Sequence, residues 1–118
     1  FPKVRVNPKP AQKPHPPVFL GGAATNVFKR VVTYGDGWMP VRATPESVRA
    51  GRASLDELAD AAGRDPKSIQ ILIYGASSRD EIDQMEEAGA DMATVRLPST
   101  APGEAIPGLE HLAEEMLV

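Results

Sequence analysis

A pair of glycines, Gly21 and Gly22, stands between a short apolar run and a segment whose apolar residues recur at helical spacing. A strand, a glycine pair and a helix N-terminus in this order form a cradle for a phosphate group. The glycines let the backbone approach an anion closely, and the first N–H groups of a helix carry roughly half a positive charge. The same residues also suit an ordinary tight turn, and the sequence by itself leaves both interpretations open.

The other residues that could do chemistry form no recognisable constellation. His15 and His111 are isolated histidines, so no metal site is predicted and both side chains are expected to face solvent. No Ser-His-Asp or Cys-His arrangement is visible. The acidic run at residues 80–87 is explained by helix capping and by a solvated helix face.

Composition excludes several classes of protein. The 118 residues allow one domain with a real core but not two. The net charge of −3 and the scattered Lys and Arg residues argue against a nucleic-acid surface. No apolar run approaches the roughly 20 residues of a membrane span, and prolines and lysines interrupt any signal-peptide core. The absence of cysteine allows a cytoplasmic location, which we expect.

The elements that must position the glycine pair follow a regular alternation. Residues 1–17 contain six of the 12 prolines and are expected to form an extended arm. Residues 18–118 then alternate between apolar runs and amphipathic segments. Connections longer than a dozen residues between successive strands predict an α/β fold with parallel strands. The predicted strands cover residues 18–20, 38–41, 69–74 and 92–97, and the predicted helices cover 26–34, 44–63 and 78–89 and a last segment from about 107.

Local signals support these boundaries. Thr44, directly before a proline, suits a helix N-cap. Ser78 and Glu81 have the spacing of a capping box, in which each satisfies an N–H group of the other. Asp36 is expected to accept a hydrogen bond within its own turn. Gly51 lies inside the second helix and should cost roughly 1 kcal/mol relative to Ala.

Four strand–helix units in this length correspond to about half of a TIM (β/α)₈ barrel, which typically takes roughly 250 residues. Right-handed crossovers put the helices on one face if the strand order is simple. Such a sheet leaves one face bare and two edges unpaired. We therefore predict a (β/α)₄ half-barrel that needs a missing N-terminal half or a second copy of itself. Because Phe1 is not a start methionine, a fragment or processed product is expected. A small open sheet is the alternative.

Sites in (β/α)₈ barrels are built at the carboxyl ends of the strands. Met39 and Arg42 lie near this end of the second predicted strand, and Tyr74 and Arg96 occupy the equivalent ends of the third and fourth. We predict that these four residues line a substrate pocket. Arg96 could pair with an anionic ligand or form a buried structural ion pair. Trp38 is expected to fill the barrel interior rather than to contact a ligand.

Two segments carry a family resemblance, PKPAQKPHPPVFLGG at Pro8–Gly22 and YGDGWMP at Tyr34–Pro40. They resemble the C-terminal half of the luciferase-like monooxygenase superfamily. There, a proline-rich connection leads into a strand ending in Gly-Gly, and a helix then runs to an aromatic-Gly-Asp-Gly-Trp turn. The resemblance implies a (β/α)₈ barrel whose fifth to eighth strands are present here. It also implies hydride transfer or oxygen activation with FMN or the deazaflavin coenzyme F-420, and slightly favours the deazaflavin.

The resemblance also implies which residues meet the cofactor. Its phosphate would lie at Gly21 and Gly22 and at the following Ala23, Thr25 and Asn26. Thr25 or Asn26 would add a side-chain donor while capping the helix. The catalytic acid or base of the family usually comes from the earlier strands, so no catalytic residue is assigned in this chain.

These observations favour the C-terminal half of a flavin- or deazaflavin-dependent oxidoreductase acting on a small organic substrate. On this hypothesis the chain contributes the cofactor phosphate site and part of the substrate pocket, and is inactive alone. Two alternatives remain: a non-catalytic half-barrel that closes by self-association, and a small domain that binds a phosphate-bearing ligand.

Overall fold

A four-stranded parallel sheet organises the molecule. The computed structural model describes residues 3, 5, 7–23, 26–97, 101 and 103–117. The sheet has the order β1-β2-β3-β4, and each neighbouring pair is parallel, which confirms the predicted α/β fold. Its strands are β1 (Phe19–Gly21), β2 (Gly37–Met39), β3 (Gln70–Ala76) and β4 (Met92–Val95).

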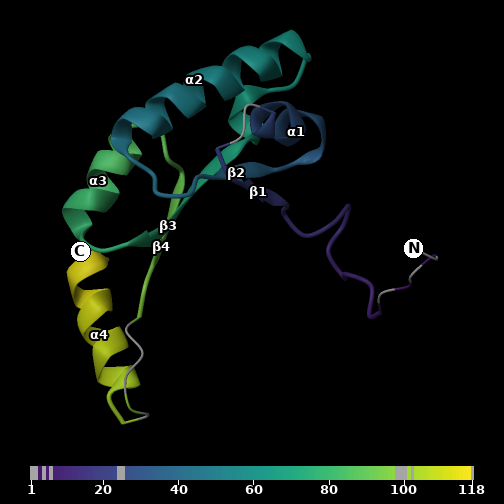
Figure 1. Ribbon diagram of the computed structural model, residues 1–118. Coiled ribbons are helices and arrows are strands. Elements are labelled where there is room, and N and C mark those ends of the chain that lie inside the picture. The colour runs from purple at the N-terminus through teal and green to yellow at the C-terminus, as the bar shows by residue number, and fades with distance from the viewer. Residues whose placement is uncertain are drawn as a thin grey trace.

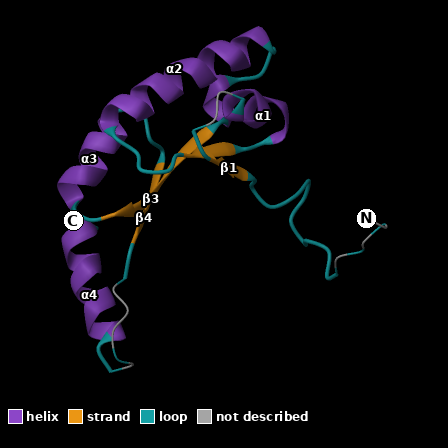
Figure 2. Cartoon of the chain, viewed as in Figure 1, coloured by secondary structure: helices purple, strands orange, loops and turns teal. Residues whose placement is uncertain are grey.

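A helix follows each strand, as predicted. The helices are α1 (Val27–Tyr34), α2 (Pro45–Ala61), α3 (Arg79–Glu87) and α4 (Ala105–Met116), with a short 3-10 helix η1 (Pro66–Ser68) before β3. Figures 1 and 2 show α1, α2 and α3 along one face of the sheet, with α4 beyond the end of α3. This is the arrangement of a partial (β/α)₈ barrel. None of the described helices combines the length and the apolar character needed to cross a membrane.

The first two helices form for reasons visible in the sequence. In α1, Val27 and Val31 are four residues apart and both buried, so they lie on one helix face. In α2, Thr44 is the N-cap, as predicted, and its Oγ1 accepts a hydrogen bond from the backbone N of Ser47. Ser47 Oγ accepts one from the backbone N of Thr44 at 2.9 Å, which completes a capping box.

The core lies between the sheet and the helices. In β3, Ile71 and Ile73 are buried against the helices, whereas the intervening Leu72 is only partly buried and Tyr74 is 65% exposed. The apolar run of β3 is therefore covered on one face only in this chain. The buried cluster is Val27, Val31, Trp38, Val48, Leu55, Ala59, Ile69, Ile71, Ile73, Met85 and Ala88.

Trp38 belongs to this helix-facing core, which corrects the prediction that it fills the barrel interior. The Trp38 side chain is only 3% exposed, and its ring meets Phe28 of α1 edge to face, with centroids 4.8 Å apart. A Cβ at Gly51 of α2 would overlap the Trp38 ring. Trp38 therefore packs between β2 and both helices. Side chains alternate along a strand, so the neighbouring Met39 faces the opposite, inner side of the sheet.

Two aspartates tie the even-numbered strands to the strand before them. Asp36 Oδ2 accepts a hydrogen bond from the backbone N of Val18 at 2.7 Å, so the prediction that Asp36 bonds within its own turn is wrong. Asp91 Oδ2 accepts one from the backbone N of Ile71, also at 2.7 Å. In both cases the aspartate N–H donates back to the carbonyl of the same residue. These reciprocal bonds fix the start of each strand pair.

Candidate functional site

The carboxyl ends of the four strands share one edge of the sheet, because all strands are parallel. Gly21 is in register with Met39 on this edge, and Gly22 follows directly. Arg96 follows the last residue of β4, and Tyr74 lies within β3, two residues before its end. Of the predicted site residues, Gly21, Gly22, Met39, Tyr74 and Arg96 thus lie at or near the carboxyl ends of the four strands.

Gly22 has a conformation that suits glycine and leaves open space beside it. Its φ is +108°, which strains any residue with a Cβ, and among the described residues other than its two chain neighbours no heavy atom lies within 4 Å of where a Cβ would stand. The Gly22 carbonyl accepts a hydrogen bond from Trp38 Nε1 at 2.9 Å. This bond joins the Gly-Gly pair to the Gly-Asp-Gly-Trp turn, two segments that the sequence presented separately.

The N-terminus of α1 lies just after this turn. Asn26 is the N-cap residue but makes no side-chain capping hydrogen bond, so of the two predicted alternatives, Thr25 or Asn26, the second does not cap α1 through its side chain. Its backbone φ of −96° and ψ of 0° are helical instead of extended, which takes the side chain away from the usual capping geometry. Thr25, the other predicted donor, lies outside the described residues.

Arg42 lies in the bend that follows β2. Its φ is +54°, the one described non-glycine residue with a positive φ, and its side chain is exposed. Non-glycine residues in this region are uncommon and concentrate at functional sites and turns. Arg42 therefore projects from a constrained bend just after the carboxyl end of β2, where part of the substrate pocket was predicted.

The ends of β3 and β4 are shaped by a bulge at Gly75. Ile73 is in register with Ala93 and Ala76 with Val95, so Tyr74 and Gly75 together lie opposite Thr94 alone, and Gly75 has a φ of +76°. Thr94 Oγ1 accepts the Gly75 N–H at 3.0 Å. Arg96 Nη2 lies 3.9 Å from where a Cβ on Gly75 would stand. The Arg96 guanidinium therefore lies beside Gly75, the residue that follows Tyr74 in β3.

Two hollows in the described part of the chain lie elsewhere. A hollow of 410 Å³ is lined by Ile73, Ile82, Met85, Glu86, Ala90, Asp91, Met92 and Ala93. A larger groove of 780 Å³ lies by the residues that precede β3 and β4, at the amino ends of these strands. None of the predicted site residues lines either one. The described residues contain no cluster of His, Asp and Glu that could hold a metal ion.

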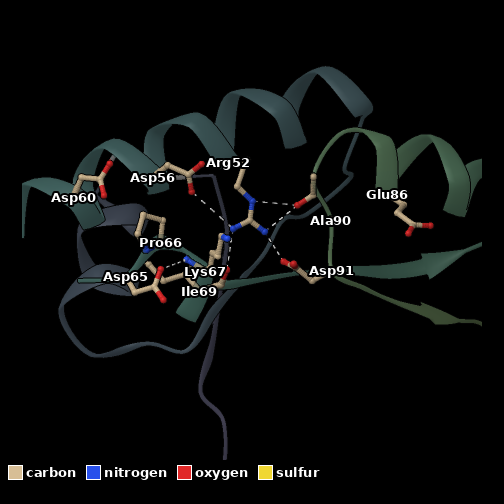
Figure 3. Close-up of a pocket in the computed structure, with 11 residues that line it drawn as sticks. Arg52, Asp56, Asp60, Asp65, Pro66, Lys67, Ile69, Glu86, Ala90 and Asp91 are labelled. Carbon is tan, nitrogen blue, oxygen red and sulfur yellow. Dashed lines mark hydrogen bonds and ion pairs between the residues drawn. The ribbon is translucent and has the colours of Figure 1, made fainter. Parts of the chain in front are cut away.

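Figure 3 shows that Arg52 occupies the centre of the larger groove. Its Nη1 donates to the Ile69 carbonyl at 2.9 Å, its Nη2 donates to the Gly89 carbonyl at 2.9 Å, and it pairs with Asp91. These bonds use the guanidinium to join α2, the start of β3 and the turn before β4. Because the face of a barrel at the amino ends of its strands is associated with stability, we interpret the groove as a structural contact between these elements.

Two carboxylates have perturbed pKa values, and both belong to helix starts. Hydrogen bonds from the Ser77 hydroxyl and backbone lower the pKa of Glu81. A backbone hydrogen bond and the Thr44 side chain lower the pKa of Glu46. Ser78 Oγ accepts the Glu81 N–H at 3.2 Å, so the predicted capping box is half correct, with Ser77 in place of Ser78 as the second donor. Glu81 thus belongs to the cap of α3, whereas Glu46 is an acidic residue in the first turn of α2.

The exposed histidine of the arm has a neighbour that the sequence did not reveal. His15 Nδ1 lies 3.7 Å from Asp36 Oδ2, and the His15 side chain is about half exposed. The two residues are 21 positions apart, so sequence proximity gave no signal for this pair. Trp38 and Thr94 were missed as supports of the site for the same reason, because their partners lie on neighbouring strands.

The strand order and the helices on one face of the sheet define a partial (β/α)₈-barrel protein. The model of the luciferase-like monooxygenase family matches residues 1–115, and the chain belongs to this family. The crystal structure of DmoA from Hyphomicrobium sulfonivorans is similar at 24% sequence identity and a TM-score of 0.42. That match covers 62% of this chain and 17% of the DmoA chain. No curated protein sequence matches this chain.

Proposed function

We propose that this chain is the C-terminal half of a flavin- or deazaflavin-dependent oxidoreductase. The observation that carries the proposal is the family match over residues 1–115, which coincides with four consecutive β/α units in simple order. On this proposal β1 to β4 are the last four strands of the barrel, and an N-terminal half completes it. A cytoplasmic location is part of the proposal, and the absence of cysteine is compatible with it.

The proposed cofactor is FMN or the deazaflavin coenzyme F-420, and the residues at the end of β1 fit its phosphate. Gly22 leaves open space beside the backbone, Gly21 ends β1, Ala23 follows Gly22, and Asn26 is the N-cap residue of α1. The first N–H groups of α1 have no partner within the helix and favour a negative charge. Thr25 completes the proposed set. When bound, the cofactor supplies the hydride chemistry, whereas this chain holds its phosphate end.

The substrate side of the proposal rests on the other three strand ends. Met39 lies on the inner side of β2, and Arg42 projects from the bend after it. The exposed ring of Tyr74 and the guanidinium of Arg96 lie at the ends of β3 and β4. These groups combine apolar surface with positive charge, which suits a small organic substrate carrying an anionic group. The acid or base of the reaction is assigned to the N-terminal half.

The proposal is tested by titrating the complete protein with FMN and with coenzyme F-420. We expect one of them to bind in the micromolar range and its phosphate-free counterpart to bind more weakly. If neither binds more tightly than millimolar, the proposed function fails. Replacing Gly22 by Val should weaken binding of the phosphate-bearing form, because φ at this position is +108°.

A second candidate function, a non-catalytic half-barrel that self-associates, is favoured by the surfaces that this chain leaves open. Within the described ranges, no strand pairs with the outer side of β1 or β4, and each residue of β4 is exposed. Two copies that pair through the outer sides of their β1 and β4 strands would make an eight-stranded barrel and cover these surfaces. Sedimentation of the 118-residue chain tests this arrangement, because a monomer of 12.6 kDa excludes it.

A further inference from the structure

We propose that Trp38 is a positioning residue for the phosphate-binding turn, acting through its hydrogen bond to Gly22. This inference rests on the cofactor site proposed above and adds a residue that does not touch the ligand. The observation behind it is the 2.9 Å bond from Trp38 Nε1 to the Gly22 carbonyl. The two residues belong to different β/α units, so the bond fixes the end of β1 relative to β2.

The direction of this bond determines where the next N–H group points. In a trans peptide, the carbonyl of one residue and the N–H of the following residue point in opposite directions. The Gly22 carbonyl points to the indole of Trp38, on the core side of the turn. The N–H of Ala23 therefore points away from the core, where an anion from solvent reaches it. Without the indole donor, a glycine turn with an open side can rotate this peptide plane.

Trp38 is itself held firmly enough to serve as an anchor. The ring is 3% exposed and packs edge to face on Phe28 at an interplanar angle of 82°. On the α2 side, Gly51 has no side chain, and the Trp38 ring occupies the space where its Cβ would be. The backbone of Trp38 is in register with Leu20 on β1 and Ile71 on β3. The indole N–H therefore has one preferred direction, towards Gly22.

The test replaces the Trp38 side chain in the complete protein with β-(3-benzothienyl)alanine, which keeps the shape of the ring and removes the N–H donor. Binding of FMN and coenzyme F-420 is compared with binding of their phosphate-free counterparts. We expect the dissociation constant of the phosphate-bearing cofactor to rise about three- to tenfold, the loss of one net hydrogen bond. Binding of the phosphate-free counterpart should change less than about twofold. A purely structural role would weaken both alike.

Trp38→Phe is the second variant, and Ile73→Val is the matched control for lost packing. Ile73 is buried in β3, away from β1, so its shortening should lower the melting temperature without changing the preference for phosphate. If the wild-type protein binds the cofactor and the benzothienyl variant keeps the full phosphate preference, the role of Trp38 is refuted. If the wild type binds neither cofactor, the proposed function fails first, and the two results are distinguishable.

Discussion

At the scale of single residues, the most consequential feature is the contact between Gly51 and Trp38. Sequence propensity describes Gly51 as a weak point of α2, since glycine in a helix costs roughly 1 kcal/mol relative to alanine. The structure gives this glycine a packing role, because the indole ring fills the space of its missing side chain. The glycine that lowers the helix propensity of α2 is therefore also the residue that lets Trp38 of β2 be buried against this helix.

Gly51→Ala should therefore destabilise the protein, although alanine is the better helix former. The new methyl group overlaps the Trp38 ring, and overpacking of this kind typically costs 1–3 kcal/mol, about the same as or more than the gain in propensity. Urea unfolding would show a net decrease in the free energy of unfolding, and tryptophan fluorescence would report a displaced indole.

Gly108→Ala is the matched control for this prediction. Gly108 lies within α4, and no heavy atom is found within 4 Å of the position of its Cβ. The substitution should raise the free energy of unfolding by about 0.5–1 kcal/mol. If both substitutions stabilise the protein to the same extent, the packing role of Gly51 is wrong.

At the scale of elements, the sequence predicted the helices, strands and caps that depend on local residue spacing. It did not predict the features that depend on contacts between different elements. Four strands and four helices, their order and the Thr44 cap follow from apolar periodicity and capping signals. The partner of Asp36, the face to which Trp38 points and the bulge at Gly75 all depend on contacts between different strands or helices. The candidate substrate residues were predicted from their positions at strand ends and remain predictions, whereas the hydrogen bonds of Trp38 and Thr94 to neighbouring segments required the structure.

The C-terminus of α1 receives hydrogen bonds from a single side chain of another segment, that of Arg64. Arg64 Nη1 donates to the carbonyls of Val31 at 3.1 Å, Val32 at 3.1 Å and Gly35 at 2.8 Å. The Val31 and Val32 carbonyls belong to the last turn of α1 and the Gly35 carbonyl to its C-cap, and the Val31 carbonyl also accepts the Gly35 N–H at 2.8 Å. A cation at this end of the helix also complements the helix dipole. Arg64, which follows α2, therefore caps α1 across the helix layer.

Replacing Arg64 with Met should lower the free energy of unfolding by about 1–3 kcal/mol, because the methionine keeps the apolar stem but leaves the carbonyls without this donor. Arg49→Met is the control, since Arg49 is exposed on α2 and should contribute within about 0.5 kcal/mol. Equal losses for the two variants in chemical denaturation would contradict the capping role.

The start of α3 gives a prediction for pH dependence. Hydrogen bonds from Ser77 lower the pKa of Glu81 in the folded chain, so the bonds favour folding when the carboxylate is ionised. This contribution is fully present above the ordinary glutamate pKa of 4.5 and is lost as pH falls through the lower, folded-state pKa. The stability difference between the wild type and Glu81→Gln should therefore be largest near neutral pH and shrink in acid. A difference that grew as pH fell would contradict the assignment.

At the scale of the whole molecule, the described chain forms part of a (β/α)₈ barrel, with four of its β/α units. The helices cover one face of the sheet, the inner face carries the exposed Tyr74, and β4 is exposed along its length. The proposed cofactor and substrate groups lie along the carboxyl edge of this sheet without forming a closed pocket. A completing half would supply both the missing strand pairs and the opposite side of the site.

Hydrogen exchange should show this incompleteness directly in the 118-residue chain. The backbone of β3 at Ile71–Ile73 is paired on both sides or buried, so its amides should exchange slowly, whereas the amides of β4 should exchange quickly from its open side. In the complete protein, β4 should become as protected as β3, because a neighbouring strand covers it. Protection of β4 that rises with the concentration of the isolated chain would favour closure by a second copy. Equal protection of β3 and β4 in a dilute monomer would contradict both arrangements and favour a self-sufficient open sheet.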